Sequence, residues 1–302
     1  MTVLAIVVNY NTTDDLELCV DALMSNAVDE VVVHDNASPD PAVRGTLATL
    51  ADRYGTSENP RFRVELGERN DGFGAGINGV IEMAPHFDYY WFVNPDSIPE
   101  PDCAAKVVAA MDQFHLDIAS PVITTGQDGQ TIWFAGGVLH RDRGLSEHVI
   151  VVDDDVQVVE SSFITGAAMF VRHDAWMELG GFRPDLFLYW EDAELCARAT
   201  EAGMTLGTVT DASVWHRVGA SGGVPGMSRD FHYYMNRNRL VVCGAYSSRT
   251  SVLLGRGARI TLRMIRAATR EPNAPLRKTA AGLRGAVAGL RYKHDESVAR
   301  QL

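Results

Sequence analysis

Two adjacent carboxylates follow an aromatic run in the segment Gly180–Glu194, which reads GGFRPDLFLYWEDAE. Glu191 and Asp192 come directly after Trp190 and precede a predicted helix, Ala193–Ala202. A carboxylate beside apolar rings tends to have a raised proton affinity, which suits a general base. An aspartate at this place would also serve as a helix cap. The segment by itself therefore leaves a catalytic base and a helix start as alternatives.

Polar clusters follow three short apolar runs: Asn9-Tyr10-Asn11, Asp35-Asn-Ala-Ser38 and Asn94-Pro-Asp96-Ser97. Hard carboxylate oxygens suit Mg²⁺ or Mn²⁺, so Asp96 could bind a divalent cation that sits on a nucleotide diphosphate. The Asn-Pro pair alone also predicts a turn that needs no ligand. His216, after Trp215, is either a structural histidine or a ligand beside the flexible glycine loop expected at 222–226.

A glycine-rich segment, Asn70–Asn78, opens a helix after a predicted strand. Its backbone could approach a diphosphate or a sugar closely. The glycines resemble a dinucleotide fingerprint only superficially, because the first strand of the chain ends in Asn9 with no glycine loop. A nicotinamide enzyme is therefore disfavoured. The acidic run Asp153–Asp155 is interpreted as solvated surface and not as a metal site.

The elements that must position these residues alternate between apolar runs and amphipathic helices up to about residue 125, which predicts a mostly parallel α/β sheet. Binding loops in such a sheet lie beyond the carboxyl ends of its strands, where the polar clusters fall. Residues 122–170 predict antiparallel additions to the sheet. The predicted strands are 3–8, 30–34, 61–66, 89–93, 118–121 and 205–209, and the predicted helices are 14–24, 41–54, 76–83, 102–114 and 193–202.

The composition limits the class of protein. A chain of 302 residues with 46% hydrophobic residues is long enough for one large domain with an appendage. Its four cysteines lie far apart, which predicts reduced thiols in the cytoplasm. The N-terminus looks like a first strand and not like a signal peptide, and no window predicts a membrane span.

The net charge of −12 is distributed unevenly. Residues 249–302 contain 12 Lys or Arg and three Asp or Glu, a net charge of +9, so the other 248 residues carry −21. An acidic body disfavours nucleic acid as a partner. We therefore divide the chain into a domain at 1–245 and a basic, amphipathic helical tail at 246–302.

The tail predicts two helices on either side of Pro272 and Pro275. In the first, arginines recur at spacings of three and four from Arg256 to Arg270, and the second covers Leu276–Leu290. Such helices can lie on an anionic membrane surface at the inner face of the cell membrane. The alternative is that their apolar side packs on the domain or on a second subunit, as in a homo-oligomer.

The order of the motifs carries a family resemblance. Seven motifs follow one another from Val3 to about Leu240. They are Val-Val-Asn-Tyr-Asn, Asp-Asn-Ala-Ser, Asn-x-Gly-Phe-Gly-x-Gly-x-Asn, Asn-Pro-Asp, Thr-Gly-Ala-Ala-Met-Phe-Val-Arg, Gly-Gly-Phe with Trp-Glu-Asp, and His-x-x-Gly-x-Ser. Each motif is weak alone, but the ordered set resembles the inverting family 2 glycosyltransferases of GT-A fold, and within them the bacterial rhamnosyltransferases. The resemblance implies a Rossmann-like, nucleotide-sugar-binding, mostly parallel sheet flanked by helices, with a C-terminal helical extension.

The resemblance also implies a role for each site residue. Asp192 would be the general base, with Glu191 holding the acceptor or tuning that base. The acceptor side would comprise Trp190, Thr165 and Gly166, and the metal ligands would be Asp96 and His216. The nucleotide and donor side would comprise Asn9, Tyr10, Asn11, Asp35, Asn70, Gly72, Phe73, Gly74, Asn78, Asn94, Arg237 and Asn238.

The implied reaction moves a sugar from a nucleotide-sugar donor to a glycan or lipid-linked glycan, in the synthesis of a cell-surface polysaccharide or glycolipid. The implied donor is dTDP-L-rhamnose, with UDP-galactofuranose or a UDP-hexose as the alternative, and the implied cofactor is Mg²⁺ or Mn²⁺. Asn94 stands where the family's D-x-D element has its first aspartate, which weakens the expected metal site. A catalytically silent GT-A scaffold that binds glycan or nucleotide is the alternative of another class.

Overall fold

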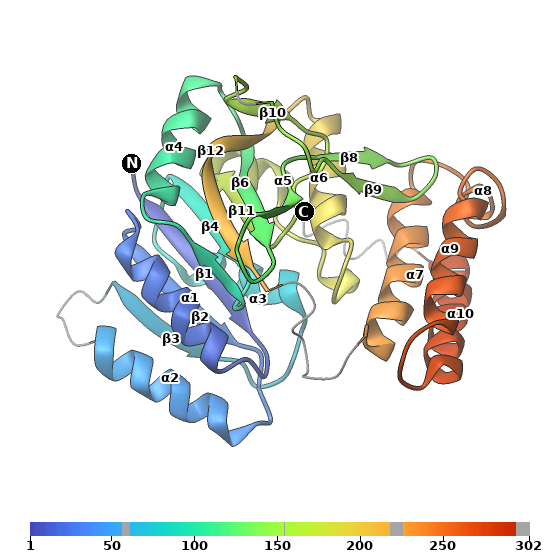
Figure 1. The fold of residues 1–302 in the computed structure, drawn as a ribbon, viewed down its shortest axis with the longest axis horizontal. Coiled ribbons are helices and arrows are strands. Elements are labelled where there is room, and N and C mark those ends of the chain that lie inside the picture. Colours follow the sequence, from blue (N-terminus) through green and yellow to red (C-terminus); the bar gives the residue numbers. More distant parts are fainter. Residues whose placement is uncertain (56–60, 154, 218–225, 294–302) are drawn as a thin grey trace.

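The computed structural model describes residues 1–55, 61–153, 155–217 and 226–293. Within these ranges, a ten-stranded mixed sheet has the order β10-β12-β6-β11-β4-β1-β2-β3, with β5 paired to β12 and β7 to β6 (Figure 1). The strands are β1 Val3–Asn9, β2 Glu30–Asp35, β3 Phe62–Leu66, β4 Tyr89–Val93, β5 Ser97–Pro99, β6 Ile118–Thr125, β7 Thr131–Phe134, β10 Val158–Glu160, β11 Ala168–Arg172 and β12 Leu206–His216, and a separate hairpin joins β8 Gly137–His140 to β9 Leu145–His148.

Helices flank this sheet and continue beyond it as a group on one side of the molecule (Figure 1). The 3-10 turn Pro184–Leu186 precedes the helix that carries the adjacent carboxylates. The helices are α1 Asp14–Ser25, α2 Pro41–Tyr54, α3 Phe73–Met83, α4 Cys103–Gln113, α5 His173–Leu179, α6 Glu191–Glu201, α7 Arg229–Cys243, α8 Arg249–Leu254, α9 Ala258–Thr269 and α10 Pro275–Arg291.

The centre of the sheet is parallel and apolar. Strand β1 pairs in parallel with β2 and β4, and β2 pairs in parallel with β3. All seven residues of β1 and all five of β4 are buried, because helices cover both faces of a parallel sheet. Strands β1, β2 and β4 therefore end at one edge, which places Asn9, Asp35 and Asn94 together, as the sequence predicts.

The observed elements differ from the predicted ones mainly in length. Strand β6 extends to Thr125 and β12 to His216, and both pass beyond the predicted ends. Helix α3 begins at Phe73, one turn earlier than predicted, because Gly72 allows the chain to enter the helix with φ 93°. Strand β5 and helix α5 were not predicted. The glycine loop expected at 222–226 lies outside the described residues except for Gly226.

The tail is helical, but the arginine stripe does not lie on one continuous helix. Helix α8 ends at Leu254 and α9 begins at Ala258, so Arg256 lies in the turn between them and Arg270 follows α9. Gly257 forces this turn, because a Cβ there would lie 1.9 Å from the carbonyl oxygen of Val252. No helix in the described ranges is long and apolar enough to cross a membrane.

Contacts cross the predicted boundary at 245/246, and the division into two parts stays a prediction. Helix α10 packs against α7 through small residues: a Cβ on Gly285 would lie 2.1 Å from the carbonyl oxygen of Tyr233. The guanidinium of Arg239 in α7 donates to the carbonyls of Gly144, at 2.8 Å, and Val252, at 2.8 Å. The tail therefore rests on the β8–β9 hairpin as well as on α7.

Candidate functional site

The ends of β1 and β2 form a polar pocket wall around Asp35, which is 5% exposed. Its Oδ1 accepts from Asn9 Nδ2 at 3.0 Å and from the Ser38 hydroxyl at 2.6 Å. Its Oδ2 accepts from the backbone N–H of Ser38 at 3.0 Å. The Asn9 Oδ1 atom is buried and has no hydrogen-bond partner in the described part of the chain. This atom is therefore a ready acceptor for a ligand N–H group.

The glycine segment lies beside this wall. Asn36 Nδ2 donates to the carbonyl of Gly72 at 3.0 Å, and Asn70 Oδ1 accepts from the Gly72 N–H at 3.0 Å. Gly72 cannot be replaced without movement, because its Cβ would lie 2.0 Å from the carbonyl oxygen of Phe187. The next residue, Phe73, donates its N–H to that same carbonyl at 3.1 Å. The predicted donor loop therefore rests on the segment that leads to the paired carboxylates.

Asp96 and His216 meet because the short strand β5 pairs with the end of β12, which sets His216 opposite Ser97. His216 Nε2 donates to Asp96 Oδ1 at 3.1 Å, and Asn94 Nδ2 lies 3.5 Å from the same nitrogen. The Ser97 N–H donates to the Asn94 carbonyl at 3.1 Å, so the Asn-Pro turn is also present. The predicted turn is therefore confirmed, and the metal-binding role of Asp96 stays a prediction.

The Asp96–His216 pair fits one divalent cation. Two ligand atoms at right angles, each about 2.1 Å from a cation, lie about 3 Å apart, which is close to the separation of these two atoms. The described residues contain no group of three or more His, Cys, Asp or Glu side chains arranged to hold a metal ion. The protein therefore offers two ligands, and diphosphate oxygens and water would have to supply the others.

Asp192 is held by backbone donors at the start of α6. Its Oδ2 accepts from the Gly166 N–H at 3.0 Å and its Oδ1 from the Ala193 N–H at 2.7 Å. The helix begins at Glu191 and its N-cap is Trp190, at φ 74°, so the alternative that Asp192 caps the helix is wrong. A Cβ on Gly166 would lie 3.2 Å from the Phe73 ring, which places the donor loop next to Asp192.

Burial raises the proton affinity of both carboxylates. Desolvation raises the pKa of Asp192, and the N–H groups of Gly166 and Ala193 and the nearby His148 oppose this increase. Desolvation, and then the charge of Asp192, raise the pKa of Glu191 well above 4.5. Glu191 is 7% exposed, and its Oε2 has no hydrogen-bond partner among the described residues. The pair therefore holds a proton at a pH where ordinary carboxylates have lost theirs.

We expect Glu191→Gln to stabilise the fold at neutral pH. The pKa of Glu191 is higher in the folded state than in the unfolded chain, so the free energy of unfolding decreases as the pH rises above about 4.5. Glutamine cannot ionise, so its advantage should be present at pH 7 and vanish towards pH 4. Urea unfolding across this range measures it.

Glu194→Gln provides the matched comparison three residues further on. Glu194 is paired with Arg198 at 2.8 Å and with Arg183 at 3.8 Å, so its replacement should destabilise the fold at pH 7. If both variants lower the free energy of unfolding at pH 7, the expectation is wrong, and the ionised Glu191 carboxylate must be stabilised by a hydrogen bond or an ion pair.

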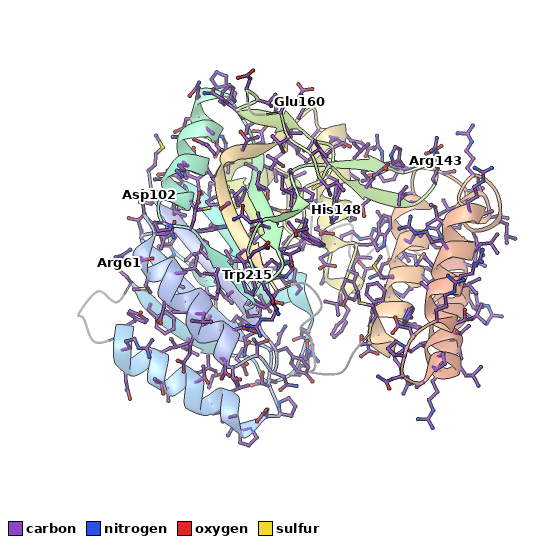
Figure 2. The ribbon with its side chains drawn as sticks, viewed as in Figure 1. Arg61, Asp102, Arg143, His148, Glu160 and Trp215 are labelled. Carbon is purple, nitrogen blue, oxygen red and sulfur yellow. The ribbon has the colours of Figure 1, made fainter. Side chains whose placement is uncertain are left out.

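Trp133 lies between His216, beside Asp96, and His148, near Asp192. Its ring centroid lies 5.3 Å from that of His216 and 4.7 Å from that of His148, both edge-on. His148, labelled in Figure 2, ends the β8–β9 hairpin, and its Nδ1 donates to the Trp133 carbonyl at 3.2 Å. Desolvation lowers the pKa of His148. Trp133 therefore links His216 to His148, whose charge acts on Asp192.

Several predicted site residues have structural partners. Asn78 holds the backbone of Phe182, donating to its carbonyl at 2.7 Å and accepting from its N–H at 2.9 Å. Asn238 is buried and donates to the carbonyls of Leu186, Leu188 and Tyr189 at 2.8–3.1 Å. These two asparagines fix the backbone of the segment before Trp190.

The remaining predicted site residues differ in their exposure and in their hydrogen-bond partners. Arg237 donates to the Asp185 carbonyl at 3.1 Å, and Thr165 is buried beside Gly166. Tyr10 is 47% exposed, and Asn11 donates its N–H to Ser38 Oγ at 2.8 Å. Gly74 packs on Phe182, where a Cβ would approach to 2.7 Å.

Three residues near the site were not singled out from the sequence. Asn36 stands within the Asp35–Ser38 cluster, and its position next to Asp35 is the sequence signal that could have identified it. Its buried Oδ1 has no hydrogen-bond partner among the described residues. Trp133 and His148 lie on β7 and β9, whose register no sequence motif announces. Six buried polar atoms without a hydrogen-bond partner in the described ranges cluster in the site segments, on Asn9, Asn36, Ser97, Trp190, Glu191 and His216.

Two family models match the chain. The model of glycosyl transferase family 2 matches residues 4–143, and that of glycosyl transferase family group 2 matches residues 92–222. The two matches together contain Asp35, Asp96 and Asp192. No curated protein sequence matches the chain.

Solved structures share the fold at low identity. GalNAc-T7 with UDP, GalNAc and Mn²⁺ aligns with 80% of this chain at a TM-score of 0.62 and 17% identity, and this chain spans 50% of GalNAc-T7. The mannosyltransferase PcManGT from Pyrobaculum calidifontis, in complex with GDP-Man and Mn²⁺, aligns with 99% of this chain at a TM-score of 0.59 and 17% identity, and the alignment covers 77% of PcManGT. S. aureus TarS 1-349 aligns with 100% of this chain at a TM-score of 0.53 and 13% identity, and the alignment covers 77% of that TarS chain. These likenesses confirm the predicted GT-A fold.

Proposed function

Because the models of glycosyl transferase family 2 and of glycosyl transferase family group 2 match residues 4–143 and 92–222, we propose that the chain is a family 2 glycosyltransferase. It would transfer a sugar from a nucleotide-sugar donor to an acceptor hydroxyl, with inversion at the anomeric carbon. One observation carries the proposal. Six of the ten buried polar side-chain atoms that lack a hydrogen-bond partner among the described residues lie where a donor and an acceptor would bind. They belong to Asn9 at the end of β1, Asn36 just after β2, Ser97 and His216 where β5 pairs with the end of β12, and Trp190 and Glu191 at the start of α6.

The donor nucleotide would bind against Asn9, Asn36 and Asp35. The unpaired amide oxygens of the two asparagines are acceptors for a pyrimidine N–H, and Asp35 is fixed by Asn9 and Ser38 in a single orientation. The glycine loop at Gly72 would allow the diphosphate to approach the backbone. These residues bind and orient the donor but take no part in proton transfer.

Asp192 would perform the chemistry as a general base. Its carboxylate takes the proton of the acceptor hydroxyl while the acceptor oxygen forms a bond to the anomeric carbon. The bond from that carbon to the diphosphate breaks, and its electron pair leaves with the nucleoside diphosphate. The N–H groups of Gly166 and Ala193 keep the carboxylate oriented, and Glu191 in its protonated form adds no competing charge.

Asp96 and His216 would hold Mg²⁺ or Mn²⁺. When bound, the cation supplies positive charge beside the departing diphosphate. Asn94 stands where a second carboxylate would be, and its Nδ2 lies 3.5 Å from His216 Nε2, so the site has one carboxylate. A site with one carboxylate binds a cation less tightly than one with two, so the donor diphosphate would supply much of the affinity.

We further propose dTDP-L-rhamnose as the donor and a glycan or lipid-linked glycan as the acceptor. The order of the sequence motifs, which resembles that of the bacterial rhamnosyltransferases, supports the rhamnose assignment. The mannosyltransferase PcManGT was solved with GDP-Man and GalNAc-T7 with UDP and GalNAc. Donors with uridine or guanosine, UDP-galactofuranose among them, are therefore the comparison set for the test.

A thermal-shift panel tests the donor. With Mn²⁺ present, dTDP-L-rhamnose should raise the melting temperature more than the uridine and guanosine donors, because ligands that bind only the folded state stabilise it. Asp96→Ala should abolish the part of the shift that depends on Mn²⁺. Asp52→Asn, which removes an exposed carboxylate on α2, should leave the shift unchanged.

Two outcomes would change the proposal. A larger shift with a uridine donor would replace rhamnose and keep the transfer reaction. Binding of donors without any release of nucleoside diphosphate in the presence of a panel of acceptor glycans would favour the silent scaffold.

A further inference from the structure

Helix α10 leaves a row of large apolar side chains in solvent. Leu276, Leu283, Val287 and Leu290 recur at spacings of seven, four and three residues, so they share one stripe of the helix. They are 85%, 51%, 45% and 38% exposed, respectively. Leu262 of the neighbouring helix α9 is 60% exposed. We call these five residues and the arginines between them the tail surface.

The register of α10 cannot change to hide this stripe. Its other side carries Gly282, Gly285 and Gly289, which lie directly on α7. A Cβ on Gly285 or Gly289 would lie 2.1 Å from the Tyr233 carbonyl oxygen or 2.7 Å from that of Arg237. Rotation of the helix would bring larger side chains against that backbone. The stripe is therefore exposed because the small side of α10 must face α7.

The tail surface is hollowed. An apolar cavity of about 240 Å³ opens between α9 and α10. A second, shallower hollow of about 360 Å³ shares Leu283 and Val287 with it and is bordered by Arg284 and Arg291. The lining of the first cavity includes Met264 and Ile265 of α9 and Leu283, Val287 and Leu290 of α10. Guanidinium groups thus stand directly beside apolar hollows.

The positive charge of the tail surface is not neutralised within the described residues. Arg284 and Arg291 border the stripe. None of the seven exposed arginines of α9, α10 and the turn between them forms an ion pair with a described residue. Glu271 is already paired with Lys278 at 2.9 Å and with His232 at 3.2 Å. The unpaired set comprises Arg259, Arg263, Arg266, Arg270, Arg277, Arg284 and Arg291.

We propose that the tail surface docks on a bilayer of anionic phospholipid. A bilayer offers a layer of phosphates at the level of the guanidinium groups and, just beneath it, an apolar layer for the leucine stripe and its hollows. A second copy of this chain is a poorer occupant. A two-fold contact would set one tail, at +9, against another of the same charge.

Docking would also orient the site. Tyr292, just after α10, donates to Asp185 Oδ2 at 2.8 Å, and Asn238 of α7 holds the Tyr189 carbonyl at 2.8 Å. Both contacts fix the segment that leads to Asp192. The acceptor side would therefore stay close to the lipid surface, within reach of a lipid-linked glycan. This last consequence rests on the proposed function, whereas the docking itself does not.

Flotation of the full-length chain with vesicles tests the docking without any sugar transfer. We expect the chain to bind vesicles that contain phosphatidylglycerol, not to bind vesicles of phosphatidylcholine alone, and to dissociate as salt is raised. The pair Arg284→Gln and Arg291→Gln should lower the partition coefficient roughly 30-fold. The pair Leu283→Ser and Val287→Ser should lower it at least about tenfold.

Matched pairs on the acidic body serve as controls. Arg44→Gln with Arg69→Gln removes two exposed charges, and Leu18→Ser with Leu66→Ser removes two exposed leucines. Both pairs should bind like the unaltered chain, and circular dichroism should show that every variant is folded.

Three results would overturn the docking. One is a lack of binding to anionic vesicles, and another is binding that neither tail pair changes. The third is a dimer in lipid-free solution, seen by light scattering, that either tail pair dissociates, because the tail surface would then belong to a second copy.

Discussion

Asp192→Asn should lower kcat by about 10²- to 10⁴-fold while the affinity for the donor nucleotide stays unchanged. Asparagine keeps the size of the side chain but cannot accept the acceptor proton. It retains one of the two oxygens that accept from Gly166 and Ala193, so the start of α6 should persist. Release of nucleoside diphosphate measures the rate, and calorimetric titration with the nucleotide measures the affinity.

The pH profile distinguishes loss of the base from misfolding. Burial raises the pKa of Asp192, so the kcat/KM of the unaltered enzyme should decline on the acid side at a pH above the ordinary aspartate range. The residual activity of Asp192→Asn should lack that decline. Asp174→Asn, an exposed carboxylate in the first turn of α5, is the control and should leave the rate unchanged. A variant rate within about threefold of the unaltered rate would remove Asp192 from the role of base.

Arg239→Leu should lower the free energy of unfolding by about 3–5 kcal/mol, because it leaves several buried carbonyls without a donor. The guanidinium is 1% exposed, and burial lowers its pKa to about 10. It donates to the carbonyls of Arg143, Gly144, Val252 and Gly257 at 2.8–3.0 Å. These acceptors belong to the turn of the β8–β9 hairpin, to α8 itself and to the turn that follows α8, so the loss should loosen the tail.

Urea unfolding and limited proteolysis measure this effect. Proteolysis of Arg239→Leu should begin in the tail, since the lost bonds include those from α7 to Val252 and Gly257. Arg229→Leu, at the exposed start of the same helix, should change the stability by less than about 0.5 kcal/mol. If Arg239→Leu stays within about 1 kcal/mol of the unaltered chain, water or rearranged backbone satisfies the carbonyls instead. Arg143, at the turn of the hairpin, is labelled in Figure 2.

The central sheet could be predicted from the sequence because its strands are continuous apolar runs. The bounds of α2 and β4 match the prediction at both ends, since Asp40 caps the first and polar residues flank the second. The tail helix was misjudged because the spacing of its arginines continues through Gly255 and Gly257, where the chain turns. Periodicity records which side chains share a face, but it does not record where the backbone reverses.

The candidate site was predictable where its residues follow strands directly. Asp35 and Asn94 stand at strand ends, so parallel topology alone brings them together. The meeting of Asp96 and His216 depends on β5, a strand of three residues that carries no sequence pattern of its own. His148 reaches the neighbourhood of Asp192 through the register of an antiparallel hairpin, and nothing local to its sequence specifies that register.

The burial of Glu191 has a consequence for anyone who engineers this chain. A laboratory selection for heat resistance alone would enrich uncharged replacements at position 191, because the buried carboxyl costs stability as the pH rises. Each such gain would be obtained next to Asp192, on which turnover is proposed to depend. Libraries should therefore hold these two positions constant, and stabilising changes should be sought on the exposed face of α2.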